Sequence, residues 1–161
     1  MERFFKVVKE FKGQDINLPK RSTEFSAGYD FEALEDVIIP GMFDVIWKGF
    51  NGGIKPGPVK VRTGVKAKFP EDEALFLHNR SSNPGKFGLI LANSVGVIDS
   101  DYYNNPDNEG EILFSFYNFG FRPRVIKKGQ KIGQGVFQKF LLVDNDNAKG
   151  KRISGHGSTG I

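Results

Sequence analysis

The sequence predicts an all-β domain, and three observations support this. Short apolar or alternating runs recur along the chain between Gly, Pro, Asn and Asp, a pattern typical of short strands joined by tight turns. Glycine accounts for 20 and phenylalanine for 16 of the 161 residues, and such a mixture of glycines and aromatics favours strands and tight turns. No segment shows a sustained helical stripe of apolar residues. Many short strands at regular spacing indicate a sandwich, a barrel or a jelly roll.

The expected strands follow from two kinds of run. Alternation is strict in residues 59–62 and 65–69, which predicts a sheet with one wet face. The other runs are apolar or mixed, and each is expected to form a strand. Together the expected strands cover residues 4–11, 37–39, 43–47, 59–69, 74–77, 89–92, 95–98, 112–119 and 132–143.

Composition changes after residue 143. Residues 144–161 contain Asp, Asn, Lys, Gly, Ser and Thr and have little apolar surface to bury. We therefore expect a β domain over residues 1–143 and an arm over residues 144–161 that is flexible when free. A frayed terminus and an arm that orders over a bound anion both fit this composition.

Composition also limits the classes of function. The absence of Cys excludes disulfides and thiolate metal sites, and two His make a His-built zinc site improbable. No apolar run has the roughly 20 residues of a membrane span, and the N-terminus lacks the apolar core of a signal peptide. These features predict a cytoplasmic protein with no membrane contact. A net charge of +4 suits an anionic small ligand and is weak evidence for nucleic acid, which we do not expect as a partner.

Five short segments carry candidate chemistry. Each alone is an ordinary strand start, turn or flexible end. The segments are Ala-Gly-Tyr-Asp-Phe at 27–31, Asn-Arg-Ser-Ser-Asn-Pro-Gly-Lys at 79–86, Asn-Ser-Val-Gly-Val-Ile-Asp-Ser-Asp-Tyr at 93–102, Gly-Gln-Gly-Val-Phe at 133–137 and Gly-His-Gly-Ser-Thr-Gly at 155–160. Their order and spacing together resemble the trimeric dUTPase family from end to end of the chain.

The resemblance carries expectations that periodicity alone does not supply. It implies a jelly-roll-like β-barrel or sandwich of the β-clip, dUTPase-like type. It implies a homotrimer with three active sites at subunit boundaries. The implied reaction is Mg²⁺-dependent hydrolysis of dUTP to dUMP and pyrophosphate, which cleanses the nucleotide pool and supplies dUMP for dTMP synthesis.

Two aspartates match family residues that activate the attacking water and interact with the metal ion. Asp99 matches the catalytic aspartate, which orients and deprotonates a water that attacks the α-phosphorus. A carboxylate is a weak base, so geometry must contribute most of the effect. Asp30 matches an aspartate that meets the Mg²⁺ through a water, while the three phosphates hold the ion. That arrangement fits the reluctance of Mg²⁺ to lose its waters.

The third segment is implied to read the nucleoside. In the family, the tyrosine that matches Tyr102 packs its ring against the deoxyribose and leaves no room for a 2′-hydroxyl. Asn93 and the hairpin backbone around Val97 and Ile98 are implied to read uracil, since an amide has both a donor and an acceptor, as uracil does. The same narrow hairpin would exclude the 5-methyl group of thymine.

The second and fourth segments are implied to hold the phosphates. Arg80, Ser81 and Ser82 match the second motif, and Ser81 is the candidate that stabilises charge on the bridge between the α- and β-phosphates. Gln134 matches a phosphate-contacting glutamine of the fourth motif.

The C-terminal arm is implied to close over the substrate. Lys151 or Arg152, together with Ser158 and Thr159, would clamp the γ-phosphate. His156 stands where many relatives have Phe, and its imidazole can stack on uracil.

The chain departs from the family pattern in two places. Residues 103–109, Tyr-Asn-Asn-Pro-Asp-Asn-Glu, separate Tyr102 from the Gly-Glu pair that usually follows it. We interpret this insertion as a surface loop beside the active site. In addition, Lys151 occupies the place of the usual arginine of the fifth motif and Arg152 lies one residue nearer the glycines, so both stay candidates.

Two alternatives remain at this point. A dCTP deaminase on the same fold needs a glutamate at the position of Ser115, and a hydroxyl cannot move protons in its place. A non-enzymatic β-sandwich module, or a dUTPase relative that binds a regulatory protein if it is phage-encoded, could use residues 42–58 and 103–109. Intact Asp99, Tyr102 and Ser81 argue for retained catalysis.

Overall fold

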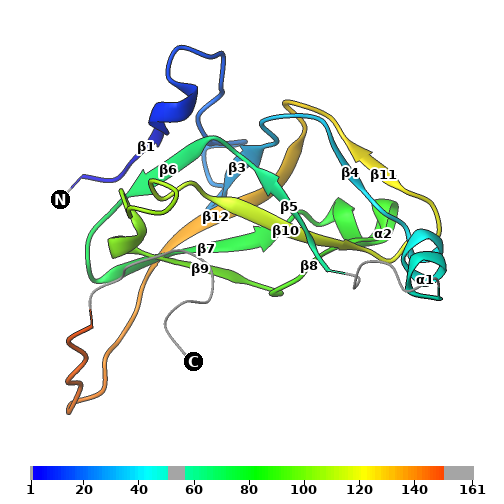
Figure 1. Ribbon diagram of the computed structural model, residues 1–161. Coiled ribbons are helices and arrows are strands. Elements are labelled where there is room, and N and C mark those ends of the chain that lie inside the picture. The colour runs from blue at the N-terminus through cyan, green and yellow to red at the C-terminus, as the bar shows by residue number, and fades with distance from the viewer. Residues whose placement is uncertain (1, 51–56, 151–161) are drawn as a thin grey trace.

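The structure is a computed structural model that describes residues 2–50 and 57–150 (Figure 1). Within these residues the chain forms twelve short strands, two short α-helices and two 3₁₀ turns. The strands are β1 (Phe4–Val7), β2 (Lys20–Arg21), β3 (Tyr29–Glu32), β4 (Val37–Ile39), β5 (Val59–Arg62), β6 (Val65–Lys68), β7 (Glu73–Asn79), β8 (Leu89–Leu91), β9 (Gly96–Asp99), β10 (Leu113–Asn118), β11 (Arg124–Ile126) and β12 (Lys131–Lys139). The helices are α1 (Met42–Phe50) and α2 (Ser82–Phe87), and the 3₁₀ turns are η1 (Lys9–Phe11) and η2 (Ser100–Tyr102).

The strands are arranged in one larger and three smaller antiparallel sheets. The five-stranded sheet has the order β2-β3-β12-β7-β9, and a three-stranded sheet has the order β5-β10-β8. Two-stranded sheets pair β1 with β6 and β11 with β4. The predicted all-β class is therefore confirmed, and open sheets that pack on one another fit the sandwich or jelly-roll prediction. Among the described residues, no helix is long and apolar enough to cross a membrane.

The core lies between the five-stranded and three-stranded sheets. Phe31 of β3 and Phe114 of β10 are both fully buried, and their ring centroids lie 5.5 Å apart. A Cβ atom at Gly133 of β12 would lie 2.1 Å from the Phe114 ring. Only glycine at this position leaves room for the ring against the sheet. The many glycines and the many aromatic residues of the sequence are thus connected, because a glycine makes space for a buried ring.

One predicted strand is wrong. Residues 43–47 belong to helix α1, and the statement that no helical stripe exists fails with it. Short apolar runs do not distinguish a strand from a helix, and apolar residues at 42, 43, 46 and 47 also have helical spacing. The Asp44 carboxylate accepts the Gly41 N–H at 3.2 Å, which satisfies a free donor at the start of the helix.

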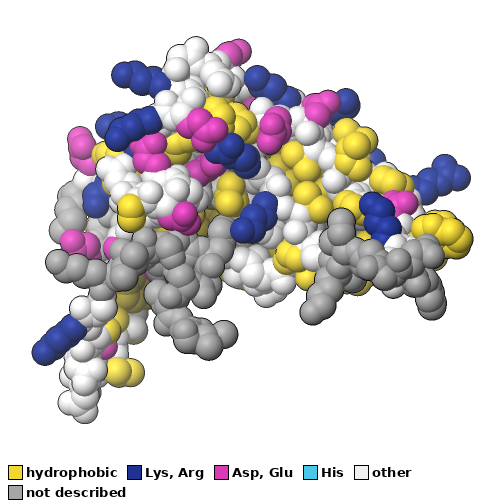
Figure 2. All heavy atoms as spheres, in the orientation of Figure 1, with side chains coloured by type: hydrophobic (Ala, Val, Ile, Leu, Met, Phe, Trp, Pro, Cys, Tyr) yellow, Lys and Arg dark blue, Asp and Glu magenta, His cyan; other side chains and the backbone are white. Residues whose placement is uncertain are grey.

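Helix α1 is largely exposed. Phe43, Ile46 and Trp47 all face solvent, and the Trp47 side chain is 65% exposed. Figure 2 shows hydrophobic side chains gathered at the right-hand end of the molecule, where Figure 1 places α1. The helix therefore owes little of its stability to packing in the core.

Several predicted strands end earlier than expected. The first strand ends at Val7 and continues as η1, and β12 ends at Lys139. Residues 140–143 form no strand, and the chain after β12 runs away from the sheets (Figure 1). Strand β11 was not predicted, because Arg124–Ile126 is too short for alternation to be recognised.

Candidate active site

Asp30 and Gln134 lie directly opposite each other on neighbouring strands. Gln134 of β12 pairs with Asp30 of β3 on one side and with His78 of β7 on the other. Directly opposed residues of antiparallel strands point to the same face of a sheet. The structure therefore brings together residues from the first and fourth motifs on one face of the sheet.

Asp30 is held by a lysine that the sequence did not single out. Lys131 Nζ lies 2.7 Å and Ser22 Oγ 2.6 Å from Asp30 Oδ2. Burial raises the pKa of the Asp30 carboxyl, but the hydrogen bonds from Lys131 and Ser22 and the charges of Lys131 and Arg80 outweigh it, so the pKa lies below its usual value. Asp30 is therefore ionised at neutral pH. Both hydrogen bonds use Oδ2, which leaves Oδ1 available to a water.

A bulge in β12 brings Lys131 to this face. The register between β12 and β3 shifts between Lys131 and Gly133. Lys131 and Gln134 are three residues apart and would point to opposite faces of a regular strand, but one extra residue reverses this alternation. A strand read with strict alternation would put Lys131 on the face opposite Gln134, so the sequence does not predict that Lys131 contacts Asp30.

Gln134 is positioned by the glycine of the first motif. A Cβ atom at Gly28 would lie 2.3 Å from Gln134 Oε1 and 2.9 Å from Cδ. The side chain of Gln134 thus occupies the space that any larger residue at position 28 would need. This contact gives Gly28 a role in the site that its motif alone does not reveal.

The second motif forms the turn between β7 and α2. Arg80 follows the end of β7 and donates from Nη1 to the Lys131 carbonyl at 3.2 Å. Asn83 fixes the turn, since its Nδ2 donates to Asn79 Oδ1 at 2.7 Å and to the Ile132 carbonyl at 2.8 Å. Ser81 precedes α2 and Ser82 is its first residue. The predicted phosphate residues Arg80, Ser81 and Ser82 therefore lie at the same end of the sheet as Asp30.

The expected hairpin is not formed, because β8 pairs with β10 and β9 with β7; of the predicted base-reading residues, Asn93 lies in the turn after β8, and Val97 and Ile98 lie on β9. Strand β9 is the edge of the five-stranded sheet and pairs only with β7 among the described strands. Its outer backbone groups therefore face away from the sheet, where a ligand can reach them. Asn93 and Val97 are exposed and Ile98 is half-buried.

Asp99 and Tyr102 lie together at the far end of β9. Asp99 is the last residue of β9, and Tyr102 follows in η2. Asp99 lines a pocket of about 390 Å³ with Lys68, Glu71, Ser100, Asp101 and Phe140. The Tyr102 side chain is only 5% exposed, and its hydroxyl donates to the Glu111 carbonyl at 3.1 Å. The tyrosine is thus a fixed, largely covered ring next to Asp99.

Within one chain the two groups of predicted site residues lie far apart. Asp99 pairs with Ala74 near the start of β7, whereas Arg80 and Ser81 follow Asn79 at its end. The five residue steps from Ala74 to Asn79 span roughly 17 Å of extended strand. Figure 1 shows the same separation, with η2 and α2 near opposite ends of the β7–β9 ribbon. The structure therefore holds these two groups of predicted residues at separate places of one chain.

The predicted residues of the fifth motif lie outside the described residues. These are Lys151, Arg152, His156, Ser158 and Thr159. A larger cavity of about 620 Å³ lies along residues 104–109 and is lined by none of the predicted site residues. The described residues contain no group of three or more His, Cys, Asp or Glu that could hold a metal ion.

Comparison with known proteins assigns the family. The dUTPase family model matches residues 54–160. The deoxyuridine 5′-triphosphate nucleotidohydrolase of Lactococcus lactis is 48% identical over 161 residues, covering 98% of this chain and 97% of the relative. The chain belongs to the dUTPase family. It is an enzyme of nucleotide metabolism, a dUTP diphosphatase, and the resemblance inferred from the five motifs is confirmed.

Solved dUTPase structures share the fold. The crystal structure of the dUTPase from Streptococcus mutans has a TM-score of 0.74 and 42% identity, covering 88% of this chain and 98% of that one. A dUTPase from phage phi11 of Staphylococcus aureus has a TM-score of 0.67 at 17% identity, covering 93% of this chain and 97% of that one. The second likeness concerns the fold alone. The deaminase alternative receives no support from these relatives.

Proposed function

We propose that the chain hydrolyses dUTP through an Asp99-activated water, in sites that copies of the chain share within a homotrimer. The assignment to the dUTPase family supports dUTP as the substrate and hydrolysis as the overall reaction. The separation of the two groups of site residues along β7 supports the sharing of each site between chains. Asp99 ends the edge strand β9 and is followed by Tyr102 in η2, so the nucleoside and the attacking water would meet at one end of the sheet.

Each residue then has a defined task. Asp99 accepts the proton of the water that attacks the α-phosphorus. Tyr102 excludes the 2′-hydroxyl of ribonucleotides, and Asn93 with the backbone at Val97 and Ile98 reads the uracil edge. Ser81 donates to the bridge oxygen as the bond to the β-phosphate breaks.

The phosphate face of the sheet fits a magnesium-bound triphosphate. Asp30 is ionised and has Oδ1 available for a water ligand of Mg²⁺, which supplies charge neutralisation on the phosphates when bound. Gln134 and Arg80 are positioned to hold phosphate oxygens beside it. Lys151 or Arg152, with His156, Ser158 and Thr159, would close the site from the arm.

The described C-terminal segment supports the trimer. Phe140, Leu141, Leu142 and Val143 follow β12 and are exposed, and the Leu141 side chain is 96% exposed. Four consecutive large apolar side chains that the described residues leave exposed favour burial against another copy. Phe140 lines the same pocket as Asp99, which supports a contact between copies close to the proposed shared site.

The assay for the reaction is pyrophosphate release from dUTP with Mg²⁺. dCTP, dTTP and UTP serve as controls for base, 5-methyl and sugar selection. Fast release from dUTP alone supports the proposal. Release of ammonia from dCTP would replace it with the deaminase alternative.

The sharing of sites is tested by complementation. Ser81→Ala and Asp99→Asn are prepared separately, and each is expected to lose activity by about 10² or more. Mixed trimers formed by co-expression should regain activity, because some sites then take intact Ser81 and intact Asp99 from different chains. If both residues of a site came from the same chain, every site would keep one defect and the mixture would stay inactive.

A further inference from the structure

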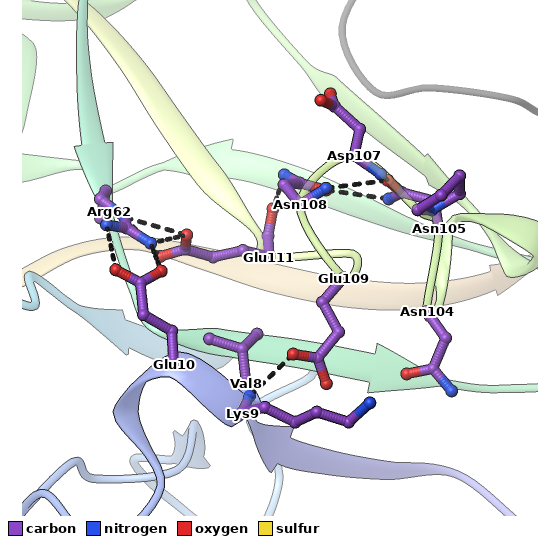
Figure 3. A pocket seen from close by; sticks show the side chains of 11 residues that line it. Val8, Lys9, Glu10, Arg62, Asn104, Asn105, Asp107, Asn108, Glu109 and Glu111 are labelled. Carbon is purple, nitrogen blue, oxygen red and sulfur yellow. Dashed lines mark hydrogen bonds and ion pairs between the residues drawn. The ribbon is translucent and has the colours of Figure 1, made fainter.

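The insertion of residues 103–109 is an ordered loop. Its ends are joined by a hydrogen bond from Asn104 N–H to the Glu109 carbonyl at 3.1 Å. Lys66 Nζ donates to Asn104 Oδ1 at 2.6 Å and forms an ion pair with Glu109. The Lys9 N–H donates to the Glu109 carboxylate at 2.8 Å. Figure 3 shows this loop along the larger cavity, with Glu109 directed at the backbone of Lys9.

The two amide side chains inside the loop point toward Tyr102. Asn105 Nδ2 donates to the Tyr102 carbonyl at 3.0 Å and to Asn108 Oδ1 at 2.9 Å. Asn108 Oδ1 also accepts the Gly110 N–H at 3.1 Å. These two donors fix which end of the Asn108 amide is oxygen, so its nitrogen must face the other way.

That nitrogen meets the hydroxyl of Tyr102. Asn108 Nδ2 lies 2.8 Å from Tyr102 Oη and 3.2 Å from the Glu111 carbonyl oxygen. The Tyr102 hydroxyl donates its own proton to the same Glu111 carbonyl. The phenol thus has one donor and one acceptor partner, and Asn108 supplies the donor. Nearly all of the ring is buried, so these bonds fix the end of an already confined side chain.

We infer that Asn108 is a positioning residue that sets the sugar selectivity of the enzyme by locking Tyr102. The inference rests on the proposed role of Tyr102 against the 2′-hydroxyl. A steric filter discriminates only if its wall resists displacement, because a shift of a few tenths of an ångström relieves a clash with one extra oxygen. The insertion gives this wall a support that a direct connection from Tyr102 to Gly110 would lack.

The test compares kcat/KM for dUTP and for UTP in the full-length chain with Mg²⁺. Asn108→Asp keeps the size of the side chain and the acceptor oxygen, but it replaces the N–H group that binds both Tyr102 and the Glu111 carbonyl by a carboxylate oxygen. That oxygen repels the Glu111 carbonyl oxygen and competes with it for the Tyr102 proton, so the end of the Tyr102 side chain is no longer held in the same place. The UTP/dUTP ratio should rise about fivefold, the value of one hydrogen bond, while kcat for dUTP stays within about twofold of wild type. A variant that only loses stability would lower the amount of active enzyme for both substrates equally, so the UTP/dUTP ratio of kcat/KM would not change.

Asp107→Asn is the matched control. It makes the reverse isosteric exchange one residue away, at an exposed side chain, and should leave the ratio unchanged. Tyr102→Phe removes the bond from Asn108 together with the bond to the Glu111 carbonyl, without altering the residues of the loop, and should give at least the same rise. The double variant Asn108→Asp with Tyr102→Phe should show no larger rise than Tyr102→Phe alone.

The outcomes separate this inference from the proposed function. If the wild-type enzyme does not hydrolyse dUTP, both the proposed function and this inference are wrong. If the wild-type enzyme hydrolyses dUTP but Asn108→Asp leaves the UTP/dUTP ratio unchanged, only this inference is wrong. If Asn108→Asp fails to fold, Tyr102→Phe decides, and an unchanged ratio there overturns the inference.

Discussion

Replacing Gly28 by Ala should impair phosphate binding through Gln134. The new Cβ would lie 2.3 Å from Gln134 Oε1, whereas non-bonded heavy atoms settle at roughly 3.5 Å. The amide must therefore move by about 1 Å. Because the clash involves the end of a flexible side chain, the fold can absorb it at little cost in stability.

The expected kinetic effect is larger than the effect on stability. A displacement of about 1 Å in a positioning group can cost up to roughly 10² in rate, so we expect kcat/KM for dUTP to fall about 10- to 100-fold. Steady-state pyrophosphate release measures the loss, and thermal unfolding measures the stability of the same preparation. Gly49→Ala is the matched control, since a Cβ there meets nothing within 4 Å, and its kcat/KM should be unchanged.

A double-mutant cycle decides whether Gln134 transmits the effect. Gln134→Ala removes the group that the new methyl displaces, so adding Gly28→Ala to it should cause little further loss. If the double variant instead lost as much kcat/KM as the two single variants combined, Gly28 would act independently of Gln134. A Gly28→Ala enzyme with wild-type kcat/KM would refute the assignment of Gln134 to the substrate.

Four further predictions concern other parts of the chain. Asp99→Asn should lower kcat by roughly 10² to 10⁴ yet keep dUTP binding, because the amide cannot accept the proton of the water; calorimetric loss of binding would contradict this. Tyr102→Ala should raise the UTP/dUTP ratio of kcat/KM by about tenfold or more, and an unchanged ratio would place sugar selection elsewhere. Arg3 hydrogen-bonds to the buried Glu73 carboxylate and lowers its pKa. This pair therefore stabilises the fold above the unfolded pKa of about 4.3 and loses that effect as pH falls through the lower folded value, so the Tm gap between wild type and Arg3→Met should close in acid. Deleting residues from Lys151 onward should leave the circular dichroism spectrum unchanged and cut kcat severely, and an unchanged kcat would remove the arm from the active site.

The fold class could be predicted because short strands leave local signals. Alternation placed Val59–Arg62 and Val65–Lys68 correctly as strands. Lys60 of the first strand is exposed as expected, whereas Lys66 of the second is buried and forms an ion pair with Glu109. Residues 43–47 were misassigned because an apolar run without alternation fits either structure. The exposure of this helix makes the error harder to avoid, since no core-facing stripe distinguishes it.

The sequence predicts a set of candidate site residues, but it does not predict how they are arranged. The motifs identified Asp30, Gln134 and Asp99 by type and order. They did not reveal Lys131, which reaches Asp30 only because a bulge reverses the alternation of β12. They also did not reveal that Gly28 leaves room for the Gln134 side chain. Both are contacts between strands that are far apart in the sequence, and no local pattern encodes them.

The register of β7 connects these observations to the assembly. One strand pairs with β9 near its start and leads into the second motif at its end, so each chain carries the proposed catalytic base and the proposed phosphate turn at opposite ends of a rigid element. Rotation of side chains cannot close a gap of roughly 17 Å, and the strand cannot bend across it without breaking its hydrogen bonds to β12. If both places hold one triphosphate, as we propose, that triphosphate bridges two chains. On this proposal the folding of one chain supplies two half-sites, and activity is a property of the assembled protein.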